Sequence, residues 1–478
     1  MNYSIIRYVL GTVLKFEALF LCLPLVVALF YREGCALDFF IVILICLTVG
    51  ELFSFKKPKS YVFYAVEGYI SVSLSWIALS LFGALPFWLS REIPSYTDAL
   101  FEAISGFTTT GASILSNVEG LSHGCLFWRS FTHWIGGMGV LVFVLAVFPM
   151  RGGQGMFLMK AESPGPSVEK LVPHVKTTAL ILYAVYTVMT IVEIILLAVT
   201  GMPVFDAVTL SLGTAGTGGF GILNDSVASY APHMQIIITV FMILFGVNFN
   251  AYYLILRKKP KAAFSEEVKV YLGIIIASSL VIAWNIRRLF PDPLEALRHA
   301  FFQVASVITT TGYSTVDFNA WPALSTTIHI TVMFIGACAG ITGGGIKVSR
   351  VVILLKSAVQ ELFLVKHPHG VSKVKLDGHS VTKETVRSVN TFMCSYVLIY
   401  MASMLLISLD NFDFTTNFTA IVATLNNIGP GLAGVGPASN FGLFSDFSKM
   451  VLMLDMLIGR LELLPMLVLF SPITWKRQ

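Results

Sequence analysis

Four short stretches of this sequence place threonine, asparagine and glycine where an apolar segment would otherwise continue as a helix. The clearest one, residues 301–313, ends in three threonines followed by Gly312. Its apolar part allows about three helical turns, fewer than the roughly 20 residues that a membrane-spanning helix needs. A glycine at its end permits backbone angles that other residues avoid. Carbonyl groups and threonine hydroxyls along such a strand can replace the hydration shell of an ion.

The pattern occurs four times, and this repetition favours an ion-binding element over an ordinary threonine- and glycine-rich loop. Alignment on the glycines brings together FEAISGFTTTG, VTLSLGTAGTG, FQVASVITTTG and TAIVATLNNIG. Internal repetition of this kind indicates a structure built from similar units. The predicted ion-binding residues are Thr109, Thr110, Gly111, Gly216, Thr217, Gly218, Thr310, Thr311, Gly312, Asn427, Ile428 and Gly429.

The composition indicates an integral membrane protein. Of the 478 residues, 56% are hydrophobic and only 12% are charged, and apolar stretches run through the whole chain. The basic residues gather in loops between these stretches, so the net charge of +5 does not require a nucleic-acid partner. The apolar run at 9–31 has no evident small-residue cleavage site, which predicts an uncleaved span rather than a signal peptide.

Each of the four units consists of a span, a short helix, the glycine element and a second span. The predicted regions are 1–60, with two extra spans at 9–31 and 37–55, and then the units 61–176, 177–265, 266–385 and 386–478. The predicted spans of the units are 62–90, 126–149, 177–200, 232–256, 270–290, 323–365, 389–409 and 446–471, and the short helices are 97–108, 204–214, 294–308 and 414–425.

The charges between the spans predict the orientation. Basic residues follow the second N-terminal span and the second spans of the repeated units. Because cytoplasmic loops are rich in lysine and arginine, these loops are predicted to be cytoplasmic. All four glycine elements then face the outer side, as expected for an all-α membrane protein with an approximately fourfold pore. The basic residues are Lys56, Lys57, Lys59, Arg151, Lys160, Lys170, Lys176, Arg257, Lys258, Lys259, Lys261, Lys476 and Arg477.

Such a pore favours a monovalent cation. Each short helix would point its C-terminal end, which carries about half a negative charge, toward the pore axis. The elements offer carbonyls and hydroxyls, whereas a divalent-ion site is expected to use carboxylates. The alternative is a sodium- or proton-coupled transporter of a small solute, although such proteins usually contain two inverted repeats. A structural scaffold would leave the four glycine elements unexplained.

The four elements resemble those of the Trk/Ktr/HKT superfamily of potassium transporters, and most closely its TrkH branch. The resemblance covers nearly the whole chain and rests on ISGFTTTGA at 104–112, GTGGF at 216–220, TTTGYS at 309–314 and NNIGPGL at 426–432. It implies potassium bound in a selectivity filter, with no covalent cofactor. It also implies a homodimer in the bacterial cytoplasmic (inner) membrane and a cytoplasmic ring of nucleotide-binding regulatory subunits of the TrkA type.

The resemblance also assigns the filter glycines. They map onto Gly111, Gly218, Gly312 and Gly429, and a glycine rather than a serine at 111 favours potassium over sodium. Gly216 departs from the pattern, since a larger residue is expected to fit there as well.

A glycine-rich stretch at 336–345 interrupts the second span of the third unit. So many glycines should break a helix, at about 1 kcal/mol each relative to alanine. Close helix packing through small residues is the alternative, but it does not explain the adjacent Lys347. A phosphate loop is excluded because Ile346 separates the glycines from that lysine. The resemblance implies an intramembrane gate loop beneath the filter. The predicted gate residues are Gly336, Ala337, Cys338, Ala339, Gly340, Thr342, Gly343, Gly344, Gly345, Lys347 and Arg460.

Arg460 is a lone arginine inside the last predicted span. A charge at that depth is costly and usually faces a cavity or a partner. One hypothesis is a local ion pair with Asp455 or Glu462. The other, which the resemblance implies, is a positive charge near the pore and next to the gate loop.

Other polar residues suggest less specific roles. Trp128, Arg129, His133 and Trp134 are typical of an interfacial belt. The loop 366–387 is the longest predicted cytoplasmic stretch and offers a docking site for a regulatory subunit.

The cysteines and the remaining polar residues do not indicate an enzyme. The six cysteines have no metal-type spacing, and only Cys35 and Cys125 could meet outside the membrane, with little to favour a disulfide. No nucleophile–base pair or zinc motif stands out in the sequence. We therefore predict a transport protein.

Overall fold

The computed structural model describes residues 2–58, 65–139, 175–368 and 372–475. Within these ranges the regular structure is helical, apart from a hairpin in which β1 (Lys375–Leu376) pairs antiparallel with β2 (His379–Ser380). Six helical segments are long and apolar enough to cross a membrane. They are α1 (Tyr3–Phe30), α2 (Cys35–Ser54), α3 (Ala65–Gly83) continued by α4 (Leu85–Leu89), α9 (Val175–Val199), α14 (Glu266–Ile286) and α18 (Lys383–Ile407).

The outer helices expose large apolar side chains. Leu37 of α2, Ile195 of α9 and Leu398 of α18 are 65%, 54% and 70% exposed. A surface of this kind suits contact with lipid rather than water. The prediction of a helical, multi-spanning membrane protein is confirmed.

Four shorter helices begin and end within two residues of their predicted positions. They are α5 (Tyr96–Phe107), α10 (Val204–Gly216), α15 (Pro293–Ile308) and α19 (Phe414–Leu425). Three of them start at a side-chain cap, because Ser95, Asp292 and Asp413 each accept a hydrogen bond from a backbone N–H of the first turn. The C-terminal halves of all four helices are buried.

The chain returns from each short helix through a further helical segment. The four segments are α6 (His123–Met138), α11 (Pro232–Phe245) with α12 (Phe249–Leu256), α16 (Ala323–Phe334) with α17 (Val348–Lys366), and α20 (Asp446–Arg460) with α21 (Leu464–Phe470). The last three of these segments are interrupted. The interruption between α16 and α17 was predicted from its glycines.

The predictions of continuous spans at 232–256 and 446–471 are wrong. α11 and α12 are bent by 89° because Asn248 starts a new helix, accepting the N–H of Asn250 at 2.9 Å. α20 ends before Glu462 and Leu463, whose positive φ angles take the chain out of the helix, and Pro465 opens α21.

The remaining short elements connect these helices. They are α13 (Pro260–Ala263), α22 (Pro472–Trp475), η1 (Phe318–Ala320), η2 (Ser408–Asp410), η3 (Ala433–Val435) and η4 (Phe441–Leu443). Residues 140–149 of a predicted span, and the predicted basic loop residues Arg151, Lys160 and Lys170, lie outside the described ranges.

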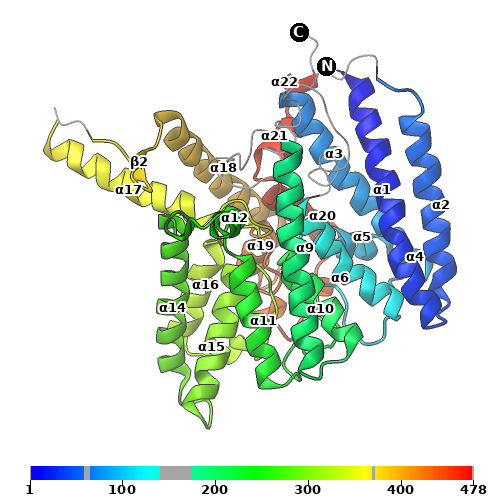
Figure 1. Cartoon of the computed structure of the whole chain (residues 1–478), viewed down its shortest axis with the longest axis horizontal. Helices are drawn as coiled ribbons and strands as arrows, with labels where there is room; N and C mark the ends of the chain where they lie inside the picture. Colours follow the sequence, from blue (N-terminus) through cyan, green and yellow to red (C-terminus); the bar gives the residue numbers. More distant parts are fainter. Residues whose placement is uncertain (1, 59–64, 140–174, 369–371, 476–478) are drawn as a thin grey trace.

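Both chain ends lie at one end of the molecule, and the turns between α1 and α2 and between α14 and α15 lie at the other (Figure 1). α17 and the β hairpin project sideways from the bundle (Figure 1).

Candidate functional site

The four short helices end in the same backbone conformation. Each is followed by a left-handed residue with φ between +54° and +56°, and two positions later by a glycine with positive φ. The left-handed residues are Thr109, Thr217, Thr310 and Asn427, and the glycines are Gly111, Gly219, Gly312 and Gly429. We call these four glycines the glycine ring.

The hydrogen bonds of these segments are also equivalent. The residue before each ring glycine donates its N–H to a helix carbonyl five positions earlier, at 2.8–3.0 Å. The pairs are Thr110 with Ser105, Gly218 with Gly213, Thr311 with Ser306, and Ile428 with Ala423. Four different sequences therefore adopt one structure.

This equivalence corrects the predicted alignment of the second segment by one residue. α10 runs through Gly216, so Thr217 is the left-handed residue, and Gly219 rather than Gly218 corresponds to Gly111. Two consecutive glycines make the alternatives indistinguishable by residue type, and only the backbone angles separate them. The expectation that a larger residue would fit at Gly216 is also wrong, because a Cβ there would overlap the carbonyl group of His133.

The segments contact one another in a closed cycle. A Cβ added to any ring glycine would approach or overlap the carbonyl oxygen of the next segment. Gly111 lies against the carbonyl of Gly218, Gly219 against that of Thr311, Gly312 against that of Ile428, and Gly429 against that of Thr110. Each ring position thus requires glycine twice, because of its φ angle and because of the neighbouring carbonyl.

A cavity of about 110 Å³ reaches the glycine ring. All four ring glycines contribute to its lining, and the described lining residues include no carboxylate. The C-terminal ends of α5, α10, α15 and α19 lead into the same segments, and each carries about half a negative charge. Backbone carbonyls combined with negative helix ends suit a cation.

Threonine hydroxyls help to hold the extended segments. The hydroxyls of Thr108 and Thr110 are 2.8 Å apart, as are those of Thr309 and Thr311. Asn427 Nδ2 also donates to the Thr110 hydroxyl at 2.9 Å, which links the fourth segment to the first.

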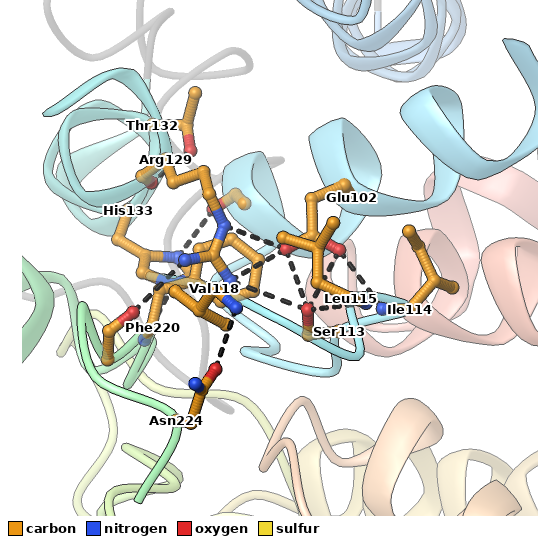
Figure 2. Close-up of polar contacts among 12 residues, drawn as sticks. Glu102, Ser113, Ile114, Leu115, Val118, Arg129, Thr132, His133, Phe220 and Asn224 are labelled. Carbon is orange, nitrogen blue, oxygen red and sulfur yellow. Dashed lines mark hydrogen bonds and ion pairs between the residues drawn. The ribbon is translucent and has the colours of Figure 1, made fainter. Parts of the chain in front are cut away.

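A buried ion pair supports the first two segments (Figure 2). Glu102 of α5 and Arg129 of α6 are 1% and 2% exposed, and Arg129 Nε donates to Glu102 Oε1 at 2.8 Å. Ser113, just after the first ring glycine, donates to Glu102 at 3.0 Å. Arg129 also donates to the carbonyl of Gly221, just after the second ring glycine, at 3.0 Å. One ion pair therefore positions two segments relative to each other.

His133 of α6 adds a second link between these segments (Figure 2). Its Nδ1 lies 2.8 Å from the carbonyl oxygen of Gly106, and its Nε2 accepts the N–H of Phe220 at 3.2 Å. Nδ1 therefore carries the proton, because only a protonated nitrogen can donate to a carbonyl.

The prediction that Trp128, Arg129, His133 and Trp134 form an interfacial belt is wrong. The first three are buried, and Trp134 is half-buried and stacked on Tyr186. A signal for this role was available: Arg129 lies in an apolar segment, and a charge in such a place usually has a partner.

The predicted gate stretch forms a buried loop, residues 335–347, on the side of the ring away from the cavity. The Thr217 hydroxyl lies 3.1 Å from that of Thr342, and the N–H of Gly344 donates to the Thr310 hydroxyl at 3.0 Å. A Cβ on Gly344 would lie 2.6 Å from Asn427 Oδ1. The loop thus contacts the left-handed residues of three segments.

The base of the 335–347 loop is closed by backbone hydrogen bonds. Gly336 donates its N–H to Ile346 at 2.7 Å, and Val348 donates to Ala337 at 3.2 Å. The N–H of Cys338 donates at 3.2 Å to the carbonyl of Gly246, in the bend between α11 and α12.

Charged side chains hold the rest of the loop. Glu267 of α14 accepts the N–H groups of Ala339 at 2.8 Å and Ser349 at 3.1 Å. Lys347 donates to the carbonyls of Gly343 and, at 2.8 Å, Gly344. The remaining predicted gate residues of the 336–347 stretch lie in the same loop. The φ angles of Gly340 and Gly345 are in the left-handed region.

Arg460 reaches the loop from the end of α20. Its guanidinium donates to the carbonyl of Gly137 at 2.7 Å and to those of Gly136 and Thr342. It also lies 3.5 Å from the hydroxyl of Thr109, the left-handed residue of the first segment.

The hypothesis of a local ion pair for Arg460 is contradicted. Glu462 instead pairs with Arg350 of α17, and Asp455 accepts a hydrogen bond from Ser403 of α18 at 2.7 Å. The positive left-handed φ angle of Glu462 turns its backbone away from the helical path that the prediction assumed.

The fold and the glycine ring define the class: a multi-spanning helical membrane protein that handles cations. Comparison with known proteins agrees. The family model of TrkH, described as a cation transport protein, matches residues 36–278 and 291–476. This chain belongs to the TrkH family. The membership confirms the predictions of the family and of a transport protein rather than an enzyme.

Individual relatives match over the full length. The Trk system potassium uptake protein TrkH of Salmonella typhimurium is 35% identical over 486 residues, which cover 100% of both chains. TrkG of Escherichia coli strain K12, also a Trk system potassium uptake protein, is 32% identical over 99% of both chains. The crystal structure of the potassium transporter TrkH from Vibrio parahaemolyticus matches with a TM-score of 0.89 and 31% identity, covering 100% of both chains.

Proposed function

We propose that this protein is the potassium-conducting membrane subunit of an uptake system, and that the glycine ring and its carbonyls are the selectivity filter. The observation that carries this proposal is the closed cycle in which four extended segments present backbone carbonyls to one another. The potassium uptake function named for full-length relatives supports potassium as the ion.

The filter would lie on the axis of a pseudo-fourfold pore. We infer four span–pore helix–filter–span units, within the predicted regions, preceded by α1 and α2. The equivalent φ angles, hydrogen bonds and cyclic contacts of the four segments support this arrangement. Two inverted repeats, as in many coupled carriers, would not produce four like segments in chain order.

The proposed potassium ligands are backbone carbonyls of the extended segments. In the set of filter residues, Gly219 takes the place of the predicted Gly216. The revised filter residues are Thr109, Thr110, Gly111, Thr217, Gly218, Gly219, Thr310, Thr311, Gly312, Asn427, Ile428 and Gly429.

The 335–347 loop would be the gate. It is buried against the left-handed residues of the second, third and fourth filter segments, and Arg460 contacts Thr109, the left-handed residue of the first. Opening must then withdraw the loop from these contacts, and the charge of Arg460 would discourage a cation from remaining there.

The partners follow from the resemblance and from exposed surfaces. We infer a homodimer in the bacterial cytoplasmic membrane, and α17 offers an apolar face for it, with Leu355, Val359 and Leu362 each more than 60% exposed. A TrkA-type nucleotide-binding subunit would dock on the cytoplasmic side, where the predicted docking segment 366–387 is the proposed contact. The β hairpin of this segment projects from the bundle (Figure 1).

Ion flux in proteoliposomes tests the transport proposal. Vesicles containing the purified protein are loaded with potassium, and the external solution contains sodium or choline. We expect potassium efflux that sodium cannot replace and that needs neither a sodium nor a proton gradient. Flux that requires either gradient would favour the coupled transporter, and equal potassium and sodium flux would contradict the filter.

A further inference from the structure

A cluster of thiols and carboxylates lies apart from the filter, near the turn between α1 and α2, at the end of the molecule opposite to the chain ends (Figure 1). Cys35 begins α2, Cys125 lies in the first turn of α6, and Glu92 lies in the loop before α5. One ligand atom of each residue lies within 4.8 Å of the others. Both cysteines are buried and Glu92 is half-buried.

Ser122 holds this cluster together. Its hydroxyl donates to Glu92 Oε1 at 2.6 Å and lies 3.2 Å from Cys35 Sγ, and its N–H donates to Glu92 Oε2 at 3.1 Å. The Glu92 carboxylate is therefore oriented next to the thiols before any ligand arrives.

Glu33 lies beside Cys35 at the edge of this cluster. Its Oε2 lies 3.8 Å from Cys35 Sγ, and it accepts the N–H groups of His123 and Gly124 at 2.8 and 3.0 Å. The His123 ring lies 2.8 Å from Glu33 Oε1 and stacks on Tyr31.

The cluster contains more negative than positive groups. Within the described ranges, neither Glu92 nor Glu33 forms an ion pair with a lysine or arginine, and only His123 faces Glu33 as a titratable base. Two carboxylates and two thiols with partial burial are expected to attract a metal ion, which would become the largest local charge.

We propose that Cys35, Cys125, Glu92 and Glu33 bind a thiophilic divalent cation of the zinc class. Zinc prefers four ligands in tetrahedral geometry and accepts thiolates at about 2.3 Å and carboxylates at about 2.0–2.2 Å. Binding forms two metal–sulfur bonds and releases two thiol protons to solvent. The cation joins the turn before α2, the loop before α5 and the start of α6, which carries Arg129 toward the filter.

The sequence spacing gives no hint of this site because its donors come from three separate parts of the chain. A Cys35–Cys125 disulfide is the competing interpretation. It would use the same thiols and leave the two carboxylates as acceptors for the N–H groups of Ser122, His123 and Gly124 at the start of α6.

Cobalt(II) titration of the full-length protein tests the proposal, because thiolate-bound cobalt has a charge-transfer absorption in the near ultraviolet. The protein is purified in detergent and kept reduced, in a Cys22→Ser/Cys394→Ser background that removes the two cysteines that are not buried. We expect one cobalt per chain, with the charge-transfer band, and displacement by zinc.

Two variants sharpen the test. Cys125→Ser should abolish the band of a two-thiolate site, and Glu92→Gln should weaken cobalt binding by about tenfold or more while retaining the band. Potassium flux of each variant reports whether it is folded, so that failure of the metal site and failure of the transport proposal are distinguishable. Absence of the band in the reduced background protein, or unchanged affinity in Glu92→Gln, overturns the proposal. Recovery of a Cys35–Cys125 disulfide from membrane-isolated protein by non-reducing peptide mapping also overturns it.

Discussion

The glycine ring and the 335–347 loop lie next to each other but are held by different interactions. The ring is positioned by main-chain contacts between segments and by the buried Glu102–Arg129 ion pair. The loop has no regular secondary structure. Lys347 and Arg460 hold it by donating to carbonyl oxygens, and Glu267 holds it by accepting the N–H of Ala339.

This difference separates selectivity from opening. A ring carbonyl can move only if a neighbouring segment moves too, because the glycine beside it leaves no free space. Lysine and arginine can exchange one set of carbonyls for another, or for water, whereas Glu267 must replace the N–H of Ala339 by another donor when the loop withdraws. Under the proposed function, the filter keeps its shape while the loop withdraws.

The largest effect is expected from breaking the ion pair under the ring. Glu102→Gln leaves Arg129 buried without its counter-charge and should lower stability by about 3–5 kcal/mol, measured as thermal unfolding in detergent. Glu51→Gln is the matched control: it breaks the half-exposed pair with Lys15 and should change stability by less than about 1 kcal/mol. Equal losses of stability in the two variants would show that the Glu102–Arg129 ion pair does not stabilise the glycine ring.

Arg460→Gln should have a smaller effect on stability. It removes hydrogen bonds from a charged donor, worth about 1.5–3 kcal/mol, and should alter potassium flux, whereas Arg460→Lys should remain closer to the parent because it keeps the charge. Addition of Glu462→Gln should not restore stability, because Glu462 pairs with Arg350. Rescue by that second change would contradict the contacts of Arg460.

Serine at a ring glycine should reduce discrimination between potassium and sodium. A side chain at positive φ strains the backbone by about 1–3 kcal/mol and overlaps the neighbouring carbonyl, which should displace that carbonyl from the ion and lower the potassium-to-sodium flux ratio. Gly111→Ser and the corrected position, Gly219→Ser, should behave alike in a flux assay. Gly273→Ser in α14 is the control, since nothing lies within 4 Å of an added Cβ. Unchanged selectivity in Gly219→Ser would refute the corrected alignment.

Shortening the 335–347 loop should change conduction rather than selectivity. The deletion also removes buried hydrogen bonds, worth about 0.5–1.5 kcal/mol each, so thermal unfolding in detergent first establishes that the variant is folded. Basal potassium flux should rise several-fold, while the potassium-to-sodium ratio remains that of the parent. A folded deletion variant with reduced flux, or with a changed ratio, would remove the distinction between gate and filter.

Much of this architecture was predictable because local sequence patterns specify it. Apolar segments of spanning length predicted the long helices, and the boundaries of α5, α10, α15 and α19 agreed within two residues. The glycine-rich stretch at 336–345 predicted an interruption between α16 and α17, because so many glycines disfavour a helix.

The errors concern residues whose environment depends on distant parts of the chain. Gly218 and Gly219 are identical in type, and only the left-handed Thr217 and the carbonyl of Thr311 select Gly219 for the ring. The place of Arg129 in an apolar segment indicated that it has a partner, but the sequence does not show that α6 turns Arg129 and His133 toward α5 and the second segment.

The sequence by itself determined the membrane class, the repeated glycine elements and the broken third unit, since hydrophobic length and backbone freedom are local properties. Only the tertiary structure decided which glycine closes the ring, that Glu102 partners Arg129, and that Arg460 donates to carbonyls instead of pairing with Asp455 or Glu462. These outcomes depend on electrostatic and steric contacts between segments up to several hundred residues apart, and spacing along the chain does not encode them.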